Sequence, residues 1–130
     1  MPDDHPVNPR IVIASLWTVM LFVFAYVDIF GFFRADILQA ALAGKVAIFA
    51  VNQTFLALTT LYIVLPSLMI FLALVLPPGF NRLLNIILAV IYAASIIGSC
   101  IGETWAYYLI GSAIEVVLLA TIVWRSWKTL

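Results

Sequence analysis

The chain has 130 residues, of which 66% are hydrophobic and 9% are charged, and its formal net charge is zero. So short a chain could not bury that much apolar surface in a water-soluble core, so the composition excludes an ordinary soluble domain and indicates a membrane protein. The zero net charge excludes the basic surface of a nucleic-acid-binding protein. Cys100 and His5 are the single cysteine and the single histidine, which excludes an intramolecular disulfide, a cysteine-based zinc site and a bis-histidine haem within one chain. We therefore expect no metal and no other cofactor.

The first apolar run, residues 11–33, is too long for the core of a signal peptide and predicts an uncleaved membrane-spanning helix. The Asn8 side chain can cap this helix, and Pro9 suits its first position because proline has no N–H to donate. Asp36 and Gln39 then have the spacing of a capping box.

Gly44 suits the position just after a helix end. We therefore expect a short helix at the membrane interface, with a plain polar loop as the alternative.

Three further spans follow, at residues 51–76, 83–101 and 106–124. Pro66 should bend the second span because it lacks an N–H and its ring crowds the preceding turn. Residues 77–79, Pro-Pro-Gly, should form a tight turn. The last span would be about 28 Å long at ~1.5 Å per residue, close to the thickness of the hydrocarbon core. The sequence thus predicts one all-α domain over residues 1–130, an integral membrane four-helix bundle with one short interfacial helix between its first two helices.

Basic residues favour one orientation of this bundle. The side of the membrane that holds both termini collects Arg10, Arg82, Arg125 and Lys128, whereas the other side holds Arg34 and Lys45. By the positive-inside rule both termini face the cytoplasm. The expected location is the bacterial inner (cytoplasmic) membrane.

Glu115 lies at the centre of the last span, where an acidic side chain costs roughly 2.5–3.5 kcal/mol and needs a partner, a proton or water. Asp28 lies about 8 Å and Glu115 about 14 Å inside the outer boundary at ~1.5 Å per residue. Each span also carries one stripe of polar or small residues, and these stripes should meet inside the bundle. We therefore expect a polar pocket in the outer half, with the short helix over residues 36–43 as its lid. The binding or proton-coupling candidates are Glu115, Asp28, Gln53, Asn52, Tyr92, Ser99, Tyr108 and Ser112.

Structural roles are the alternative for each of these residues. Hydroxyl groups on bundle faces commonly serve helix packing. Glu115 could be protonated and hydrogen-bonded to a neighbouring helix, and Asp28 could form an ion pair with Arg34 or Lys45. The sequence alone leaves these alternatives open.

Several short motifs are shared with a known group of proteins: Asp28–Gly31, Gln53–Phe55, Pro66, Asn81–Arg82, Tyr107–Tyr108 and Ile114–Glu115. On these residues the chain resembles an uncharacterised family of small bacterial four-helix membrane proteins. The resemblance covers most of the chain. It implies the same four-span topology and the same two acids, and it implies no activity.

The preferred functional hypothesis is the binding or transport of a small lipophilic or cationic solute in the polar pocket. One alternative is an accessory subunit of a larger membrane protein complex. Another is an intramembrane enzyme that acts on an isoprenoid-like substrate by acid catalysis, so the catalytic residues stay undetermined. The expected partners are membrane lipid, the small solute, and a second copy or a larger membrane complex.

Overall fold

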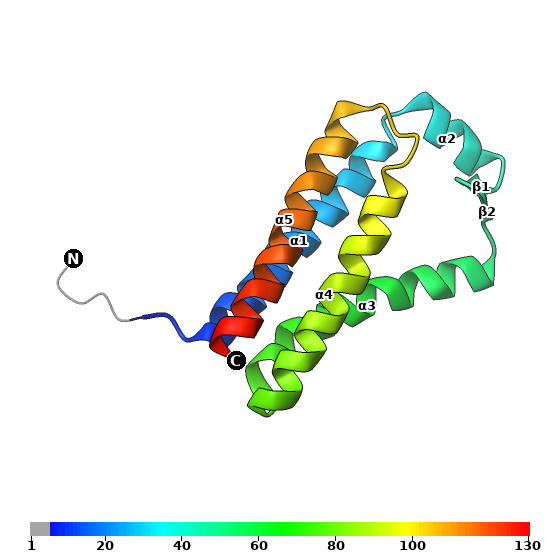
Figure 1. Ribbon diagram of the computed structural model, residues 1–130. Helices are drawn as coiled ribbons and strands as arrows, with labels where there is room; N and C mark the ends of the chain where they lie inside the picture. Colours follow the sequence, from blue (N-terminus) through cyan, green and yellow to red (C-terminus); the bar gives the residue numbers. More distant parts are fainter. Residues whose placement is uncertain (1–5) are drawn as a thin grey trace.

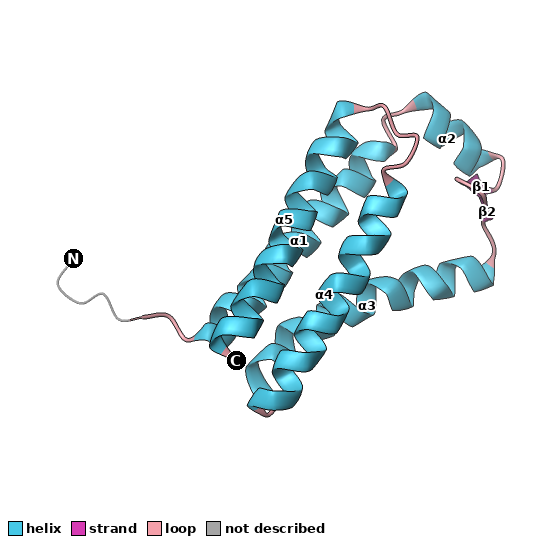
Figure 2. Ribbon diagram, viewed as in Figure 1, coloured by secondary structure: helices cyan, strands magenta, loops and turns pink. Residues whose placement is uncertain are grey.

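The computed structural model describes residues 6–130, so His5 lies outside the described residues. Five helices and one small hairpin follow one another along this described part of the chain (Figure 1; Figure 2). Their bounds are α1 (Pro9–Gly31), α2 (Ala35–Leu42), β1 (Lys45–Val46), β2 (Phe49–Ala50), α3 (Gln53–Val75), α4 (Pro78–Ser99) and α5 (Ala106–Thr129). The helices α1, α3, α4 and α5 are long and apolar enough to cross a membrane. The predicted multi-pass four-helix fold, with a short helix between the first two spans, is confirmed.

Two predicted helix ends are confirmed. The Asn8 side chain accepts a hydrogen bond from the Arg10 N–H at 2.9 Å, and Pro9 is the first residue of α1. Gly44 follows the end of α2 with φ = +83°, a conformation that glycine adopts without a steric penalty.

The predicted capping box at Asp36 is wrong. Helix α2 begins at Ala35, with Arg34 as the preceding cap residue. The Asp36 carboxylate binds the Arg34 guanidinium at 2.7 Å and accepts from the Ile37 N–H at 2.9 Å. It is therefore not available to cap the N–H three residues further on.

Two connections differ from the sequence-based expectation. Helix α4 begins at Pro78, so Pro78 and Gly79 belong to its first turn instead of a separate turn, in keeping with the preference of proline for that position. The strands β1 and β2 form a two-stranded antiparallel hairpin that was not predicted. Each strand has only two residues, which is too short to give a recognisable alternating pattern.

Helix α5 packs against both α1 and α4, whereas α3 packs mainly on α1 and makes few contacts with α4. The start of α1, the end of α3, the start of α4 and the end of α5 lie together, and we call this the terminal end of the bundle (Figure 1). The opposite end, which carries α2 and the hairpin, is called the hairpin end.

The terminal half of the bundle is closely packed around Trp17, which is fully buried. The Trp17 Nε1–H donates to Asn85 Oδ1 at 2.8 Å. The Asn85 amide donates in turn to the Asn81 carbonyl at 2.8 Å, and the Asn81 amide donates to the Ala73 carbonyl at 2.8 Å. This network joins α1, α3 and α4 across the apolar core, and its polar groups satisfy one another where lipid offers no partner.

Helix α3 divides into two unlike halves at Pro66. Pro66, Met69 and Ala73 are buried in the second half, whereas residues 53–61 are exposed apart from the half-buried Phe55. Figure 1 shows the first half of α3 diverging from α4, with the second half lying against the bundle. Helix α3 runs unbroken through Pro66, which marks the boundary between a packed segment and an unpacked one.

The hairpin end is fastened by Arg34, which is only 7% exposed. Its guanidinium pairs with Asp36 at 2.7 Å and with Glu103 at 2.9 Å, and it lies 4.4 Å from the centre of the Trp105 ring. The guanidinium holds the pKa of Asp36 below its ordinary value, and the hydrogen bond to Asp36 is the main cause that raises the pKa of Arg34. One cation thus ties the start of α2 to the loop between α4 and α5.

Candidate functional site

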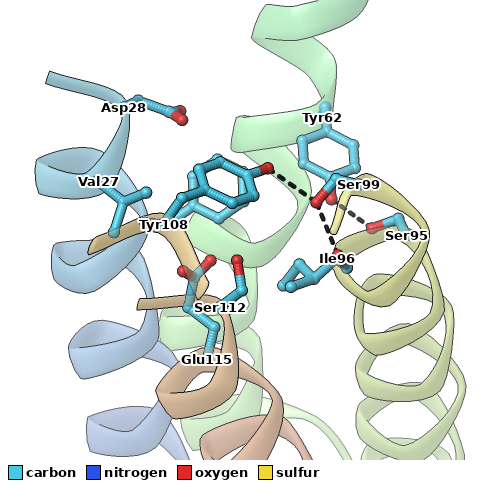
Figure 3. Close-up of a pocket in the computed structure, with 10 residues that line it drawn as sticks. Val27, Asp28, Tyr62, Ser95, Ile96, Ser99, Tyr108, Ser112 and Glu115 are labelled. Atoms are coloured by element: carbon cyan, nitrogen blue, oxygen red, sulfur yellow. Dashed lines mark hydrogen bonds between the residues drawn. The ribbon is translucent and has the colours of Figure 1, made fainter. Parts of the chain in front are cut away.

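A cavity of about 210 Å³ lies between the four long helices on the hairpin-end side of the core, and we call it the acidic pocket. It is lined by Phe24, Val27 and Asp28 of α1, Tyr62 of α3, Ser95, Ile96 and Ser99 of α4, and Tyr108, Ser112 and Glu115 of α5. Figure 3 shows the two carboxyl groups and several hydroxyl groups turned toward this space. All four spans therefore contribute to one polar cavity.

Glu115 is the most unusual group in the acidic pocket, because it carries a carboxyl group and is only 3% exposed. Within residues 6–130 this carboxyl group has no hydrogen-bond partner, and both salt bridges in that part of the chain belong to Arg34. A buried carboxyl group without a partner is unfavourable, and it is typical of a position that a ligand, a proton or water completes.

Asp28 lies at the exposed side of the same pocket. The predicted alternative of an ion pair with Arg34 or Lys45 is wrong, because among residues 6–130 both salt bridges belong to Arg34, with Asp36 and Glu103 as its partners. No basic side chain lines the pocket in the described part of the chain. The pocket thus presents two carboxyl groups without a protein cation.

Gly111 brings α1 and α5 close together beside Glu115. A Cβ atom at position 111 would overlap Val27 Cγ2 and would lie 3.7 Å from Glu115 Oε2. Glycine is therefore needed there for the close approach of the two helices that carry the acids.

Two series of hydrogen-bonded hydroxyl groups form the wall of the pocket opposite the two carboxyl groups. Tyr108 donates to Ser99 Oγ at 2.8 Å, and Ser99 donates to the Ile96 carbonyl at 2.7 Å (Figure 3). Tyr62 and Ser95 share a short hydrogen bond, and Ser95 donates to the Tyr92 carbonyl at 2.8 Å. These contacts hold the hydroxyl oxygens at the pocket surface.

Tyr92 supports the pocket without lining it. Its hydroxyl donates to the Tyr62 carbonyl at 2.6 Å. That carbonyl lies four residues before Pro66, so proline deprives it of its normal helical partner. Tyr92 of α4 supplies the missing hydrogen bond, as expected for a proline inside a membrane-spanning helix.

The structure brings together five of the eight predicted site residues in the lining of the pocket: Glu115, Asp28, Ser99, Tyr108 and Ser112. Tyr92 lies behind Tyr62, with 4.6 Å between ring centres. The prediction that Asn52 and Gln53 belong to the site is wrong, because both are exposed at the start of the half of α3 that diverges from α4. Asn52 instead caps that helix by accepting from the Phe55 N–H at 2.8 Å.

The predicted lid is also wrong. Helix α2 contributes no residue to the pocket lining and packs mainly on β1. The Arg34 contacts fix the start of α2 to the loop after α4, and Figure 1 shows the helix running from that point toward the hairpin.

The predicted site residues omitted the other five residues of the pocket lining: Tyr62, Phe24, Val27, Ser95 and Ile96. The signal that could have found Tyr62 is its position four residues before Pro66, since the freed carbonyl there calls for a donor from another helix. Phe24 lies about one helical turn before Asp28, and Val27 directly precedes Asp28 in the sequence. Both belong to an almost uniformly apolar helix, whose pattern gives no such signal.

Comparison with known proteins places the chain in a family. The family model matches residues 5–129. The chain belongs to DUF6326, a family of unknown function. No curated protein and no solved structure matches this DUF6326 chain. The family has no known function, so the chemistry of the pocket is argued from its residues.

Proposed function

We propose that the protein binds a small lipophilic cation in the acidic pocket, as the binding step of a transport or sequestration process. The observation that carries this proposal is Glu115, a carboxyl group that is 3% exposed, unpaired and turned into the cavity. A ligand cation would supply the missing counter-charge in a low-dielectric site, where such an interaction is stronger than in water.

The composition of the pocket supports a cation over other solutes. Two carboxyl groups repel anions, and the pocket lining includes no basic side chain among the described residues. The rings of Phe24, Tyr62 and Tyr108, with Val27 and Ile96, offer an apolar surface to the rest of the ligand.

We further propose that the acidic pocket lies in the outer half of a bacterial inner membrane, with both termini in the cytoplasm. The terminal end carries Arg10, Arg82, Arg125 and Lys128, and this excess of basic residues supports a cytoplasmic position for that end. The close packing around Trp17 separates the pocket from the terminal end, so access from the hairpin end is favoured.

The orientation can be tested with an impermeant maleimide on intact cells that express a Cys100→Ser background. Ile48→Cys, in the hairpin and 91% exposed, should be labelled from outside, whereas Gly79→Cys at the terminal end should react only after lysis. Labelling of Gly79→Cys on intact cells would refute the proposed orientation.

The binding proposal is tested with a pair of isosteric probes, 2-phenylpropan-2-amine and 2-phenyl-2-propanol. The amine is protonated at about pH 7, since alkyl amines have pKa values near 10. The full chain in phosphatidylcholine nanodiscs should bind the amine at least about tenfold more tightly than the alcohol in isothermal titration calorimetry, equivalent to about 1.4 kcal/mol.

Glu115→Gln and Asp28→Asn should remove this preference while the protein still folds. Tyr26→Phe is the matched control, because Tyr26 is exposed on α1 and does not line the pocket. Equal binding of amine and alcohol, or an amine preference that survives both acid substitutions, would refute the proposal.

A further inference from the structure

Four of the five hydroxyl groups that line the acidic pocket, those of Tyr62, Ser95, Ser99 and Tyr108, have already committed their protons. The fifth, on Ser112, makes no hydrogen bond within residues 6–130. A hydroxyl group has one proton to donate and two lone pairs to accept with. Ser99 gives its proton to the Ile96 carbonyl, so Tyr108 must donate to Ser99. Neither group has a second proton to offer to a ligand.

The hydroxyl groups of Tyr62 and Ser95 have likewise committed their protons. Ser95 gives its proton to the Tyr92 carbonyl. The hydrogen bond between Tyr62 and Ser95 then requires Tyr62 to be the donor. The oxygens of Tyr62, Ser95, Ser99 and Tyr108 therefore face a ligand as acceptors, alongside the carboxyl groups of Asp28 and Glu115.

We infer that the ligand of the acidic pocket is a protonated primary or secondary amine, whose N–H groups are accepted by these oxygens, in preference to a quaternary ammonium ion. This inference rests on the proposed function and narrows its ligand class. An ammonium N–H forms charge-assisted hydrogen bonds with such acceptors, whereas a quaternary ammonium has no proton to donate.

The aromatic rings support the same choice. Quaternary ammonium ions are usually recognised by the free faces of an aromatic cage. Tyr62 instead packs against Tyr92 and Phe24, with ring centres 4.6 Å and 5.9 Å apart, and Tyr108 packs edge-on against Tyr107 at 6.2 Å. The rings are engaged with one another and do not form a cage.

The volume limits the size of the amine. A dry cavity of about 150 Å³ accommodates benzene, so by proportion the pocket of about 210 Å³ holds roughly eight non-hydrogen atoms. A larger ligand must extend toward the exposed side at Asp28. An aryl-alkyl or short alkyl amine meets both limits.

The test adds phenyltrimethylammonium, an isostere of protonated 2-phenylpropan-2-amine with the same charge and no N–H. We expect the full chain in phosphatidylcholine nanodiscs to bind the amine at least about tenfold more tightly than the quaternary ion, equivalent to about 1.4 kcal/mol. Equal binding of the two cations, with both preferred over the neutral alcohol, would overturn this inference and leave the proposed function standing. Failure of both cations to bind better than the alcohol would overturn the proposed function itself.

A variant separates the hydroxyl oxygens from the carboxyl charge. Tyr108→Phe removes one acceptor oxygen and retains the ring, so it should weaken binding of the amine severalfold and leave binding of phenyltrimethylammonium unchanged. Tyr26→Phe, outside the pocket, should change neither. A Tyr108→Phe variant with an unchanged ratio between the two cations would refute selection by the hydroxyl wall.

Primary ammonium groups occur both in free amines and in the headgroup of phosphatidylethanolamine. Replacing part of the nanodisc lipid with phosphatidylethanolamine distinguishes these sources. Weaker apparent binding of the free amine would identify the headgroup as a competing ligand, and unchanged binding would identify the free amine as the ligand. In both cases the preference for N–H over quaternary nitrogen must persist, and its loss would overturn the inference.

Discussion

The hydrogen bond from the Tyr92 hydroxyl to the Tyr62 carbonyl should stabilise the protein, because Pro66 removes the helical partner of that carbonyl. Tyr92→Phe removes the hydroxyl that donates at 2.6 Å, in a residue that is 3% exposed. An unpaired buried acceptor costs about 1–3 kcal/mol in soluble proteins, and hydrogen bonds between membrane helices average about 0.6 kcal/mol. We therefore expect the free energy of unfolding to fall by about 1 kcal/mol.

The Pro66→Ala background gives this prediction its specificity. Alanine at position 66 restores an N–H that can donate to the Tyr62 carbonyl within α3. In that background Tyr92→Phe should cost no more than about half as much, which a double-mutant cycle measures as coupling between the two positions. Unfolding in mixed micelles, titrated with dodecyl sulfate and followed by circular dichroism, provides the free energies.

Tyr26→Phe serves as the control for loss of an exposed hydroxyl, and it should have little effect in either background. Equal losses for Tyr92→Phe with proline and with alanine at position 66 would show that the hydroxyl does not compensate for the proline. That result would refute the role of Tyr92 as the donor to the carbonyl that Pro66 leaves unpaired.

Two further predictions concern helix packing and pH. Gly111→Ala should lower the free energy of unfolding by about 1–3 kcal/mol, because the added Cβ would overlap Val27 Cγ2 and overpack the α1–α5 contact. Gly98→Ala is the control, because no atom lies within 4 Å of its added Cβ, and it should not be destabilising in the same assay. The pKa of Asp36 is held below its ordinary value of 3.8 by Arg34, so its contribution to stability is present above that value and is lost as the pH falls through the lower, folded pKa. The protection factors of the α2 amides, which correct for the intrinsic pH dependence of exchange, should therefore fall below about pH 4. Asp36→Asn should show low protection factors at every pH, and protection factors that do not change with pH in the unmodified chain would contradict this.

The membrane spans could be predicted from the sequence because lipid imposes a simple requirement on length and hydropathy. The two acids of the pocket could also be located, since Asp28 and Glu115 are unusual in otherwise apolar helices. Their placement on one cavity follows from the tendency of polar groups in membrane helices to avoid lipid.

The position of α3 could not be predicted in the same way. In the second span, the stripe of polar or small residues includes Asn52, Thr59 and Pro66 at intervals of seven residues, and such a stripe predicts one inward face along the whole helix. In the structure Thr59 is exposed and donates to the Phe55 carbonyl of its own helix at 2.8 Å. A hydroxyl group that donates to a carbonyl of its own helix can face lipid, so a polar stripe does not by itself indicate a helix interface.

The buried polar network was equally hard to foresee. Asn85 was recognisable as a polar residue in the inner half of its span, but its partner Trp17 lies 68 positions away in the sequence. Interfacial tryptophan is the usual expectation in a membrane protein. Only the packing of α1 on its neighbouring helices reveals that Trp17 is an interior residue.

The division of α3 at Pro66 makes the pocket sensitive to the membrane itself. The second half of the helix is fixed by protein contacts, whereas the apolar first half has its side chains exposed along most of its length. We therefore expect hydrophobic mismatch to set its inclination, with a thinner bilayer favouring greater tilt and a thicker one favouring a more upright segment. Tyr62 lies between this segment and Pro66 and forms part of the pocket wall, so we expect bilayer thickness to alter the geometry of the acidic pocket through a single helix.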